Sequence, residues 1–215
     1  MMSKNVLCPL DGRYAAKVSP LAQYMGEEAL AVARVQTECA WLKVLLGLHL
    51  PGLAAPSAKV QNALDVLPRL QADDFAALHA YEFSGRNGRP ATNHDVKAVE
   101  YFIQEKLSAS PLKPYIPWVH FALTSEDVNS VSYAVLLADG LEKVLLPALE
   151  ELRRKLTLLA RKEAKSVLLA RTHGQPAVPT TFGKEVRVFE SRLARQLESL
   201  KKQRISCKFS GAVGC

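Results

Sequence analysis

The chain has 215 residues, 48% of them hydrophobic and 23% charged, a composition that excludes a disordered protein. Its formal net charge of +7 suits a small polyanionic ligand or an acidic remainder of the chain better than nucleic acid, because no aromatic residues are interleaved with Lys and Arg. The N-terminus lacks the apolar core of a signal peptide, and no apolar run reaches the roughly 20 residues of a membrane helix. We therefore expect a cytoplasmic protein without a membrane partner.

The cysteines are scattered along the chain, at Cys8, Cys39, Cys207 and Cys215. They form no C-x-x-C pair and have no histidine at ligand spacing, so neither a disulfide framework nor a structural zinc site is expected. Reduced thiols and no bound metal are the expectation.

Apolar residues recur at helical spacing along the chain and clean period-2 strands are absent, so the sequence predicts an all-α fold. The first helix is expected from about Pro20 to Gly47, with Ser19 as its N-cap. The next helices are expected at residues 57–66, 73–82 and from 93 or 95 to 107. A loop rich in Gly, Asn and Pro at residues 84–90 precedes the last of them.

A proline-rich connector at residues 111–117 is the best candidate for a domain boundary. We expect a small N-terminal helical domain at residues 1–117 and the first part of a central long-helix bundle at residues 118–215. One long helix opens at Thr124 and contains Pro147, which is expected to bend it. A second runs from about Thr181 to Ser206.

Both long helices carry an apolar stripe. The first stripe has spacings of 4, 4, 4, 3, 4 and 3 residues, at Leu137, Leu141, Leu145, Leu149, Leu152, Leu156 and Leu159. Two helices cannot bury such stripes alone, so the sequence predicts further helices or self-association. Because the last residues read as the middle of a motif, the chain is expected to be part of a longer protein.

Two polar clusters in the first half of the chain do not fit the helix-building pattern. Arg13 and Tyr14 follow an Asp-Gly turn, and their guanidinium and phenol together are suited to grip an anion. In the second cluster, Thr92 or Asn93 is expected to cap the helix that follows. Neutral His94, next to Asp95, then lies beside free backbone N–H groups and is suited to contact a phosphate or carboxylate.

Two further clusters flank the long helices. Thr124 and Ser125 either cap the first of them, which local evidence favours, or bind a carboxylate with the same free amides. The segment 171–176 joins the two helices, and its Gly and Pro impose a non-helical path. A histidine held there, His173, is placed to transfer a proton at neutral pH, although a loop histidine is more often a bystander.

In their order along the chain, these clusters resemble the adenylosuccinate lyases of the aspartase/fumarase superfamily. The matching text is PLDGRY from Pro9, TNHDVKAVEYF from Thr92, HFALTSEDVN from His120 and RTHGQPA from Arg171. The likeness covers essentially the whole chain. It implies elimination of fumarate from adenylosuccinate, giving AMP, and from a succinyl-aminoimidazole-carboxamide ribotide.

The resemblance also implies an all-helical homotetramer that needs no metal and no organic cofactor, with sites built from three subunits. It assigns His173 as the general acid. It assigns the substrate-binding positions to Arg13, Tyr14, Asn93, His94, Asp95, Thr124 and Ser125. The serine that acts as base would lie on a loop beyond residue 215, so the 215 residues alone are expected to be inactive. The loop at residues 84–90 looks longer than is usual for the family.

Two alternatives stay open from the sequence. One is a non-catalytic helical scaffold that kept the fold for assembly, against which the retained His173, hydroxyl and arginine positions argue. The other is a sister lyase that acts on another amino-succinate. Binding of AMP, but not of arginine or aspartate, would separate these possibilities.

Overall fold

The structure, a computed structural model, describes residues 7–48, 50–53 and 55–214. Cys215 and the first residues, on which the signal-peptide argument rested, lie outside the described residues. Apart from one two-stranded sheet, the secondary-structure elements of the described chain are all helices, which confirms the predicted all-α class. No helix in the described part of the chain is long and apolar enough to cross a membrane.

The chain divides into two compact units, Met1–Ala138 with Ser206–Cys215 and Asp139–Ile205. The proline-rich connector lies within the first unit, as the short 3-10 helix η2 (Lys113–Trp118). The domain boundary expected at residue 117 stays a prediction.

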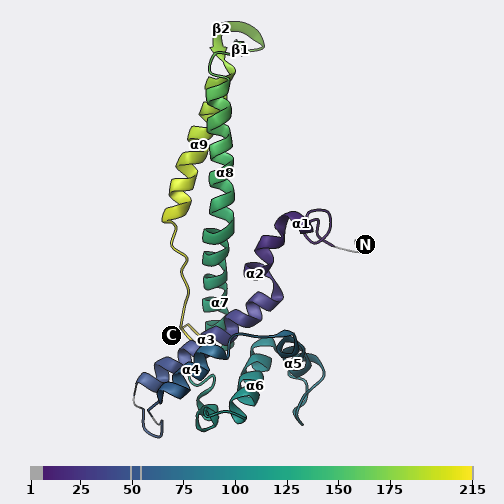
Figure 1. Cartoon of the computed structure of the whole chain (residues 1–215), viewed down its shortest axis with the longest axis vertical. Coiled ribbons are helices and arrows are strands. Elements are labelled where there is room, and N and C mark those ends of the chain that lie inside the picture. Colours follow the sequence, from purple (N-terminus) through teal and green to yellow (C-terminus); the bar gives the residue numbers. More distant parts are fainter. Residues whose placement is uncertain (1–6, 49, 54, 215) are drawn as a thin grey trace. The chain divides into compact units, whose positions relative to one another are not determined.

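The helices of the first unit are shown in Figure 1. They are α1 (Ala15–Val18), the 3-10 turn η1 (Ser19–Leu21), α2 (Ala22–Met25), α3 (Glu27–Gly47), α4 (Ala58–Val66), α5 (Ala72–Phe83), α6 (Asp95–Ser108), η2 and most of α7 (Ser125–Gly140). Helices α4, α5 and α6 agree with the predicted ranges within one or two residues. Ser57 caps α4 by accepting the Val60 N–H, as its position before the helix favours.

The prediction of one helix from Pro20 to Gly47 was wrong at its start. Gly26 has an extended backbone (ψ 166°) and separates α2 from α3. Ser19 lies in η1 and donates its hydroxyl to the Ala16 carbonyl, so it caps no long helix. Glu27 and Glu28 follow Gly26 in the first turn of α3, where carboxylates favour a helix N-terminus.

The core of the first unit is apolar and is built by α3, α4, α5, α6 and η2. Its most buried large side chains include Leu46, Leu64, Tyr81, Phe102 and Leu107. Cys39 of α3 is also part of this core, and burial raises the pKa of its thiol to about 12. Three polar residues of α3, Arg34, Thr37 and Glu38, are buried too.

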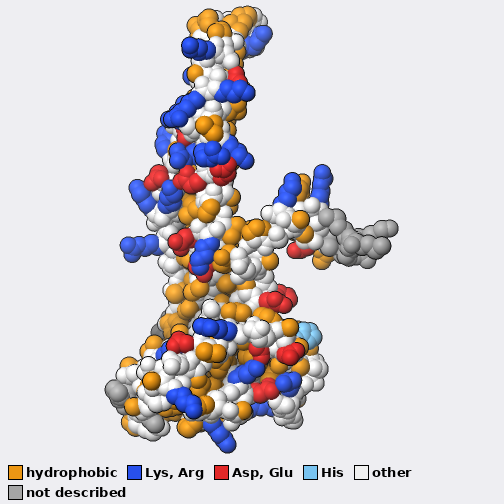
Figure 2. Space-filling model, in the orientation of Figure 1, with side chains coloured by type: hydrophobic (Ala, Val, Ile, Leu, Met, Phe, Trp, Pro, Cys, Tyr) orange, Lys and Arg blue, Asp and Glu red, His pale blue; other side chains and the backbone are white. Residues whose placement is uncertain are grey.

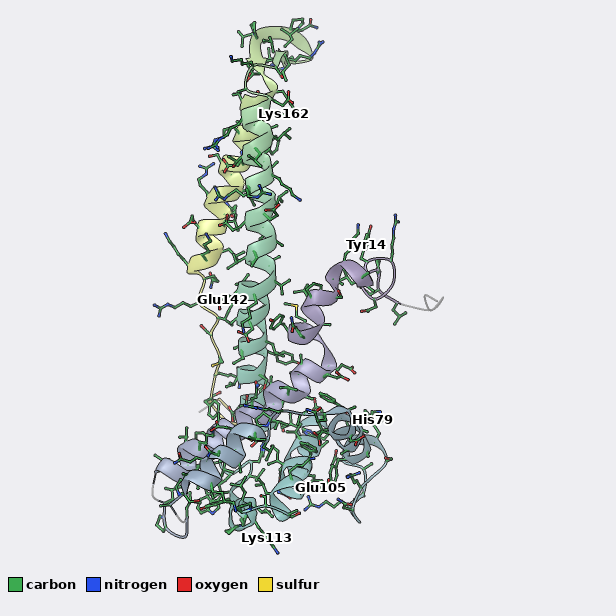
Figure 3. All side chains as sticks on the ribbon, viewed as in Figure 1. Tyr14, His79, Glu105, Lys113, Glu142 and Lys162 are labelled. Carbon is green, nitrogen blue, oxygen red and sulfur yellow. The ribbon has the colours of Figure 1, made fainter. Side chains whose placement is uncertain are left out.

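The loop at residues 84–90 forms a tight turn against α6. The Arg86 and Arg89 backbones pair across it, while Asn87 and Gly88 have positive φ. The guanidinium of Arg86 donates two hydrogen bonds to the carboxylate of Glu105, labelled in Figure 3, and holds the pKa of Glu105 at about 2. The loop is therefore an ordered part of the fold.

The second unit consists of a π-helical turn (Leu141–Leu145), α8 (Leu146–Lys162), β1 (Val167–Thr172), β2 (Gln175–Thr181) and α9 (Phe182–Lys202). Figure 1 shows α8 and α9 side by side, with the β1–β2 hairpin joining them at one end. The prediction of no strand was wrong here, because segment 167–181 pairs with itself as an antiparallel hairpin. Helix α9 ends four residues before the predicted Ser206.

The first long helix contains an unexpected π-helical turn before Pro147. Proline has no N–H and therefore cannot form the α-helical bond to the carbonyl of Lys143. In the structure, the N–H of Leu146 donates to the carbonyl of Leu141, five residues earlier. The extra residue of this turn lets α7 pass into α8 although a proline lies at the junction.

Helices α8 and α9 approach each other closely at the hairpin end. The N–H of Gly183 donates to the Glu163 carbonyl (3.0 Å), and a Cβ on Gly183 would lie 2.4 Å from the Ala160 carbonyl oxygen. Farther along the helices, buried Glu190 binds Arg153 (3.3 Å) and Arg187 (2.7 Å). These contacts fix the pairing of the two helices.

The apolar stripes of the second unit remain partly uncovered, as the sequence predicts for two helices alone. The stripe of α9 consists of Phe182, Val186, Phe189, Leu193, Leu197 and Leu200. Exposed members of the two stripes include Leu145, Leu152, Leu159, Phe182 and Phe189. Figure 2 shows hydrophobic side chains at the surface along these helices, among Lys, Arg, Asp and Glu side chains. Such a surface favours association with further helices.

Candidate functional site

The N-terminus of α6 is capped by His94 itself, which corrects the prediction that Thr92 or Asn93 is the cap. The Nδ1 atom of His94 accepts the Lys97 N–H (3.3 Å). Thr92 instead binds the backbone of His94, accepting its N–H (3.2 Å) and donating to its carbonyl (2.9 Å). Asn93 has a φ of 47°, which puts it outside the range of an N-cap. The Nε2 atom of His94 takes no part in this cap.

At the N-terminus of α7, the hydroxyls of Thr124 and Ser125 do not make, among the described residues, the capping contacts that the local sequence favours. The carboxylate of Asp127, in the first turn of α7, accepts the N–H of Thr124, the residue before the helix (3.0 Å). The Ser125 hydroxyl lies 3.4 Å from Nε2 of His94. The fold thus brings together two clusters that lie 31 residues apart in the sequence.

Asp127 also holds a distant backbone segment. Its second carboxylate oxygen accepts the N–H groups of Ser210 (2.9 Å) and Gly211 (3.1 Å). Burial of this carboxyl opposes its ionisation, but the backbone donors together hold the pKa of Asp127 below its usual range. The segment around Gly211 is therefore tied to the start of α7.

Asp95, the residue after His94, is bound by an arginine that the sequence analysis did not select. Arg34 of α3 donates to Oδ2 of Asp95 (2.5 Å) and to Oδ1 of Asn129 (2.9 Å). The one signal in the sequence was an arginine between Ala33 and Val35, on the face of α3 that is buried.

Arg13 and Tyr14 lie at the start of α1, where Figure 3 labels Tyr14. The guanidinium carbon of Arg13 is 5.6 Å from the centre of the Tyr14 ring, and Lys17 Nζ is 5.8 Å from it. In the described chain, no hydrogen bond or ion pair joins Arg13 or Tyr14 to His94, Asp95 or Ser125. These two residues form a separate, exposed, positively charged group.

His173 lies in the turn of the β1–β2 hairpin in the second unit. Both turn residues have positive φ, 50° for His173 and 75° for Gly174, as in the tight turns that suit a two-residue hairpin. Arg171 donates to the Gly174 carbonyl (3.1 Å) and stiffens the turn. The His173 side chain is exposed, so it is available to a ligand that approaches the hairpin.

A buried ion pair supports the segment that leads into α7. Nδ1 of His120 lies 2.5 Å from Oε1 of Glu38, whose other oxygen is buried without a hydrogen-bond partner among the described residues. The hydrogen bond to Glu38 raises the pKa of His120, and burial opposes this increase. Glu100 raises that pKa further and Lys97 lowers it.

We expect this pair to make stability depend on pH. Because the pKa of His120 is raised in the folded protein, its stabilisation is complete below the unfolded value of about 6.5 and is lost as the pH rises through the folded pKa. The advantage in thermal midpoint of the wild type over His120→Gln should therefore shrink as the pH rises from about 6.5 through the folded pKa. As a control, His79→Gln removes an exposed histidine of α5, labelled in Figure 3, that stacks on Phe83. A difference in thermal midpoint between wild type and His120→Gln that stays constant with pH would contradict the role given to the His120–Glu38 pair.

Among the described residues, no group of three His, Cys, Asp or Glu is arranged to hold a metal ion. The α6 and α7 N-termini instead bring together an imidazole (His94), a hydroxyl (Ser125) and a carboxylate (Asp95) that is paired with Arg34. This chemistry is suited to hold anionic oxygens.

Comparison with known proteins assigns the family. The family model described as "Lyase" matches residues 12–215. The chain belongs to this lyase family. Adenylosuccinate lyases of Haemophilus influenzae and Legionella pneumophila (strain Philadelphia 1) are 40% and 37% identical to it over 213 residues. That of Escherichia coli K12 is 37% identical over 219 residues. These relatives confirm the resemblance drawn from the sequence motifs.

The lyase-family chain spans less than half the length of these relatives. The alignments cover 98–100% of this chain and 45–46% of the relatives. Solved structures agree in fold: fumarate lyase from Mesorhizobium sp. BNC1 has a TM-score of 0.70 at 21% identity over 90% of this chain and 42% of its own. A β-carboxy-cis,cis-muconate cycloisomerase from Acinetobacter calcoaceticus reaches 0.66, also at 21% identity, over 91% of this chain and 43% of its own.

Proposed function

We propose that the whole protein is an adenylosuccinate lyase that eliminates fumarate from adenylosuccinate to give AMP. The single observation that carries this proposal is the 37–40% identity to the adenylosuccinate lyases above along essentially all of this chain. The same reaction on succinyl-aminoimidazole-carboxamide ribotide is part of the proposal, as are a homotetrameric assembly and a cytoplasmic location. No metal or organic cofactor is needed for this chemistry.

The reaction requires a proton to leave the carbon beside a carboxylate, after which the carbon–nitrogen bond breaks. Negative charge develops on the substrate and is stabilised by donors that are already in place. We assign protonation of the departing nitrogen to His173, and removal of the carbon-bound proton to a base from the remainder of the longer protein. A positioned acid of this kind typically contributes about 10²–10⁴-fold to the rate.

The remaining predicted residues are proposed to bind the substrate, and the donors among them to contact its phosphate and carboxylates. In the first unit, His94 and Ser125 lie 3.4 Å apart at two helix N-termini, with Asn93 and Thr124 adjacent to them in the chain. Helix N-termini favour anions because the helix dipole is positive there. At α6 the Val96 and Lys97 amides are already bound by Asp95 and His94, so there the contact falls to side-chain donors. Asp95 belongs to the same group and is held by Arg34.

The test is turnover by the purified full-length protein, followed by the loss of adenylosuccinate absorbance and the appearance of fumarate. Argininosuccinate and aspartate serve as competing substrates for a sister lyase of the superfamily. Turnover of adenylosuccinate alone supports the proposal. Turnover of another amino-succinate favours the sister lyase, and absence of any turnover together with intact assembly favours a non-catalytic scaffold.

We expect residues 1–215 expressed alone to show no turnover above a mock preparation. The reason is exposure: His173 and its neighbours in the hairpin lie open to solvent, and the apolar stripes of α8 and α9 lack cover. The proposed elimination also needs a base, which is assigned to a segment outside these residues, so the acid alone cannot complete the reaction. Turnover by a sequence-verified 215-residue chain, measured beside the full-length protein, would contradict this expectation.

Arg13→Ala in the full-length protein should weaken substrate binding more than it slows the chemical step. An arginine that grips a remote anion stabilises the ground and transition states alike, so KM rises while kcat changes little. Steady-state kinetics separate the two parameters. Lys17→Ala is the matched control, because it removes the other cation beside the Tyr14 ring. A fall in kcat at unchanged KM would instead place Arg13 at the reacting end of the substrate.

A further inference from the structure

Helix α3 turns a charged side chain into the interior of the first unit. Arg34 is only 8% exposed, although transfer of a charge out of water is costly unless it is fully paired. Its neighbours one turn along α3 bind the 120–132 segment: the Thr37 hydroxyl, which also donates to the Ala33 carbonyl, contacts Ser132 (3.2 Å), and Glu38 contacts His120. Arg34 contacts two different helices.

The two partners of Arg34 lie at helix N-termini. Asp95, whose Oδ2 is 2.5 Å away, is the first residue of α6, and Asn129, whose Oδ1 is 2.9 Å away, is in the second turn of α7. A guanidinium is planar and rigid, so donation from both Nε and Nη2 fixes the angle between its two acceptors as well as their distance. The hydrogen bond from Arg34 to Asp95 joins α3 to α6.

These partners are adjacent to the His94–Ser125 pair. His94 directly precedes Asp95, and Ser125 is one helical turn before Asn129 on the same face of α7. The separation of 3.4 Å between Nε2 of His94 and Oγ of Ser125 therefore depends on how far apart the two helix N-termini are held.

We propose that Arg34 is a positioning residue that sets the spacing of His94 and Ser125 for an anionic group of the substrate, an inference that rests on the function proposed above. Arg34 acts through these residues and does not touch the substrate. Two of its donors are already occupied by Asp95 and Asn129, and 9% of its side chain is exposed. The anion meets the imidazole of His94 and the hydroxyl of Ser125.

The experiment uses the full-length protein with Arg34→Lys, which keeps the charge but loses the planar fork, and Asn129→Ala, which removes one acceptor. Arg154→Met is the matched control, because Arg154 donates two hydrogen bonds to Glu151 on the surface of α8. Each variant is measured for kcat, KM and thermal midpoint, alone and combined with Ser125→Ala. Crystal structures of the wild type and of Arg34→Lys give the His94–Ser125 distance.

The expected result is a fall in kcat/KM of about 10- to 100-fold for Arg34→Lys, mostly through KM, since misplacement of a binding group by about 1 Å has effects of this size. Its effect and that of Ser125→Ala should be non-additive, because both act on one site. Unchanged kcat/KM, or full additivity with Ser125→Ala, would overturn the inference. If Arg34→Lys melts below the assay temperature, the kcat/KM of Asn129→Ala and its additivity with Ser125→Ala decide the question instead.

Failure of the proposed function is distinguishable from failure of this inference. A wild type without turnover refutes the function, and the crystal structures then decide about Arg34. A His94–Ser125 separation that opens by about 1 Å in Arg34→Lys supports the positioning role, and an unchanged separation overturns it.

Discussion

Replacement of His173 by Asn in the full-length protein should lower kcat by at least about 100-fold and leave KM nearly unchanged, as expected when a positioned proton donor is removed. Asn is chosen because His173 has a φ of 50°, and Asn tolerates this left-handed conformation better than Ala. The hairpin turn should therefore keep its shape while the imidazole is lost. Steady-state kinetics over a range of pH provide the measurement.

Two controls test whether the loss of activity comes from the missing imidazole. Gln175→Ala changes a side chain at the other end of the same turn without removing a titratable group. Added imidazole should restore part of the activity of His173→Asn, because a free imidazole can supply the missing proton. Near-normal turnover by His173→Asn would remove His173 from the mechanism.

Gly183→Ala should destabilise the protein by at least about 2 kcal/mol, toward the upper end of the range for overpacked interiors. The added Cβ would lie 2.4 Å from the Ala160 carbonyl oxygen and 2.7 Å from the Cα and N of Ala164. These are backbone atoms of the chain at the C-terminal end of α8, so no side chain can move aside to relieve the contact. Denaturant unfolding followed by far-UV circular dichroism measures the loss.

The matched control is Gly47→Ala at the end of α3. Nothing lies within 4 Å of a Cβ built there, and Ala is favoured over Gly in a helix by up to about 1 kcal/mol. The control should therefore be neutral or slightly stabilising. Equal stability of the wild type and Gly183→Ala would mean that α8 and α9 do not pack as closely as the structure has them.

The helices near residues 57–66, 73–82 and 93–107 were predictable because each has a local start signal and an apolar face. The break at Gly26 had a signal as well, a glycine followed by two glutamates, which favours a new helix start over a continuous helix. The hairpin was missed for a physical reason. Pro176 and Pro179 argue against a strand, but both strands of an isolated hairpin are edges, where proline is tolerated.

The spacing of the leucine stripe also contained a signal for the π-helical turn. Leu137, Leu141, Leu145 and Leu149 are spaced by four residues each time. In a regular α-helix, each step of four advances by about 40° around the axis, so three such steps would turn the stripe by about 120°. A turn with one extra residue, found at Leu141–Leu145, compensates for this drift.

The candidate site was predictable only in its individual parts. His94 and Ser125 stood out because each lies next to a helix start. Their proximity, and the role of Arg34, depend on contacts between residues 31, 61 and 95 positions apart, which local patterns do not encode.

The buried thiol of Cys39 can report how often the core of the first unit opens. Its thiol is buried and has a pKa of about 12, so the reactive thiolate is nearly absent in the folded state, whereas Cys207 is exposed. An alkylating reagent added to the native protein should therefore mark Cys207 at once, and Cys39 only when α3 separates from the core. The rate at which Cys39 acquires the label reports how often that core opens, without any denaturant.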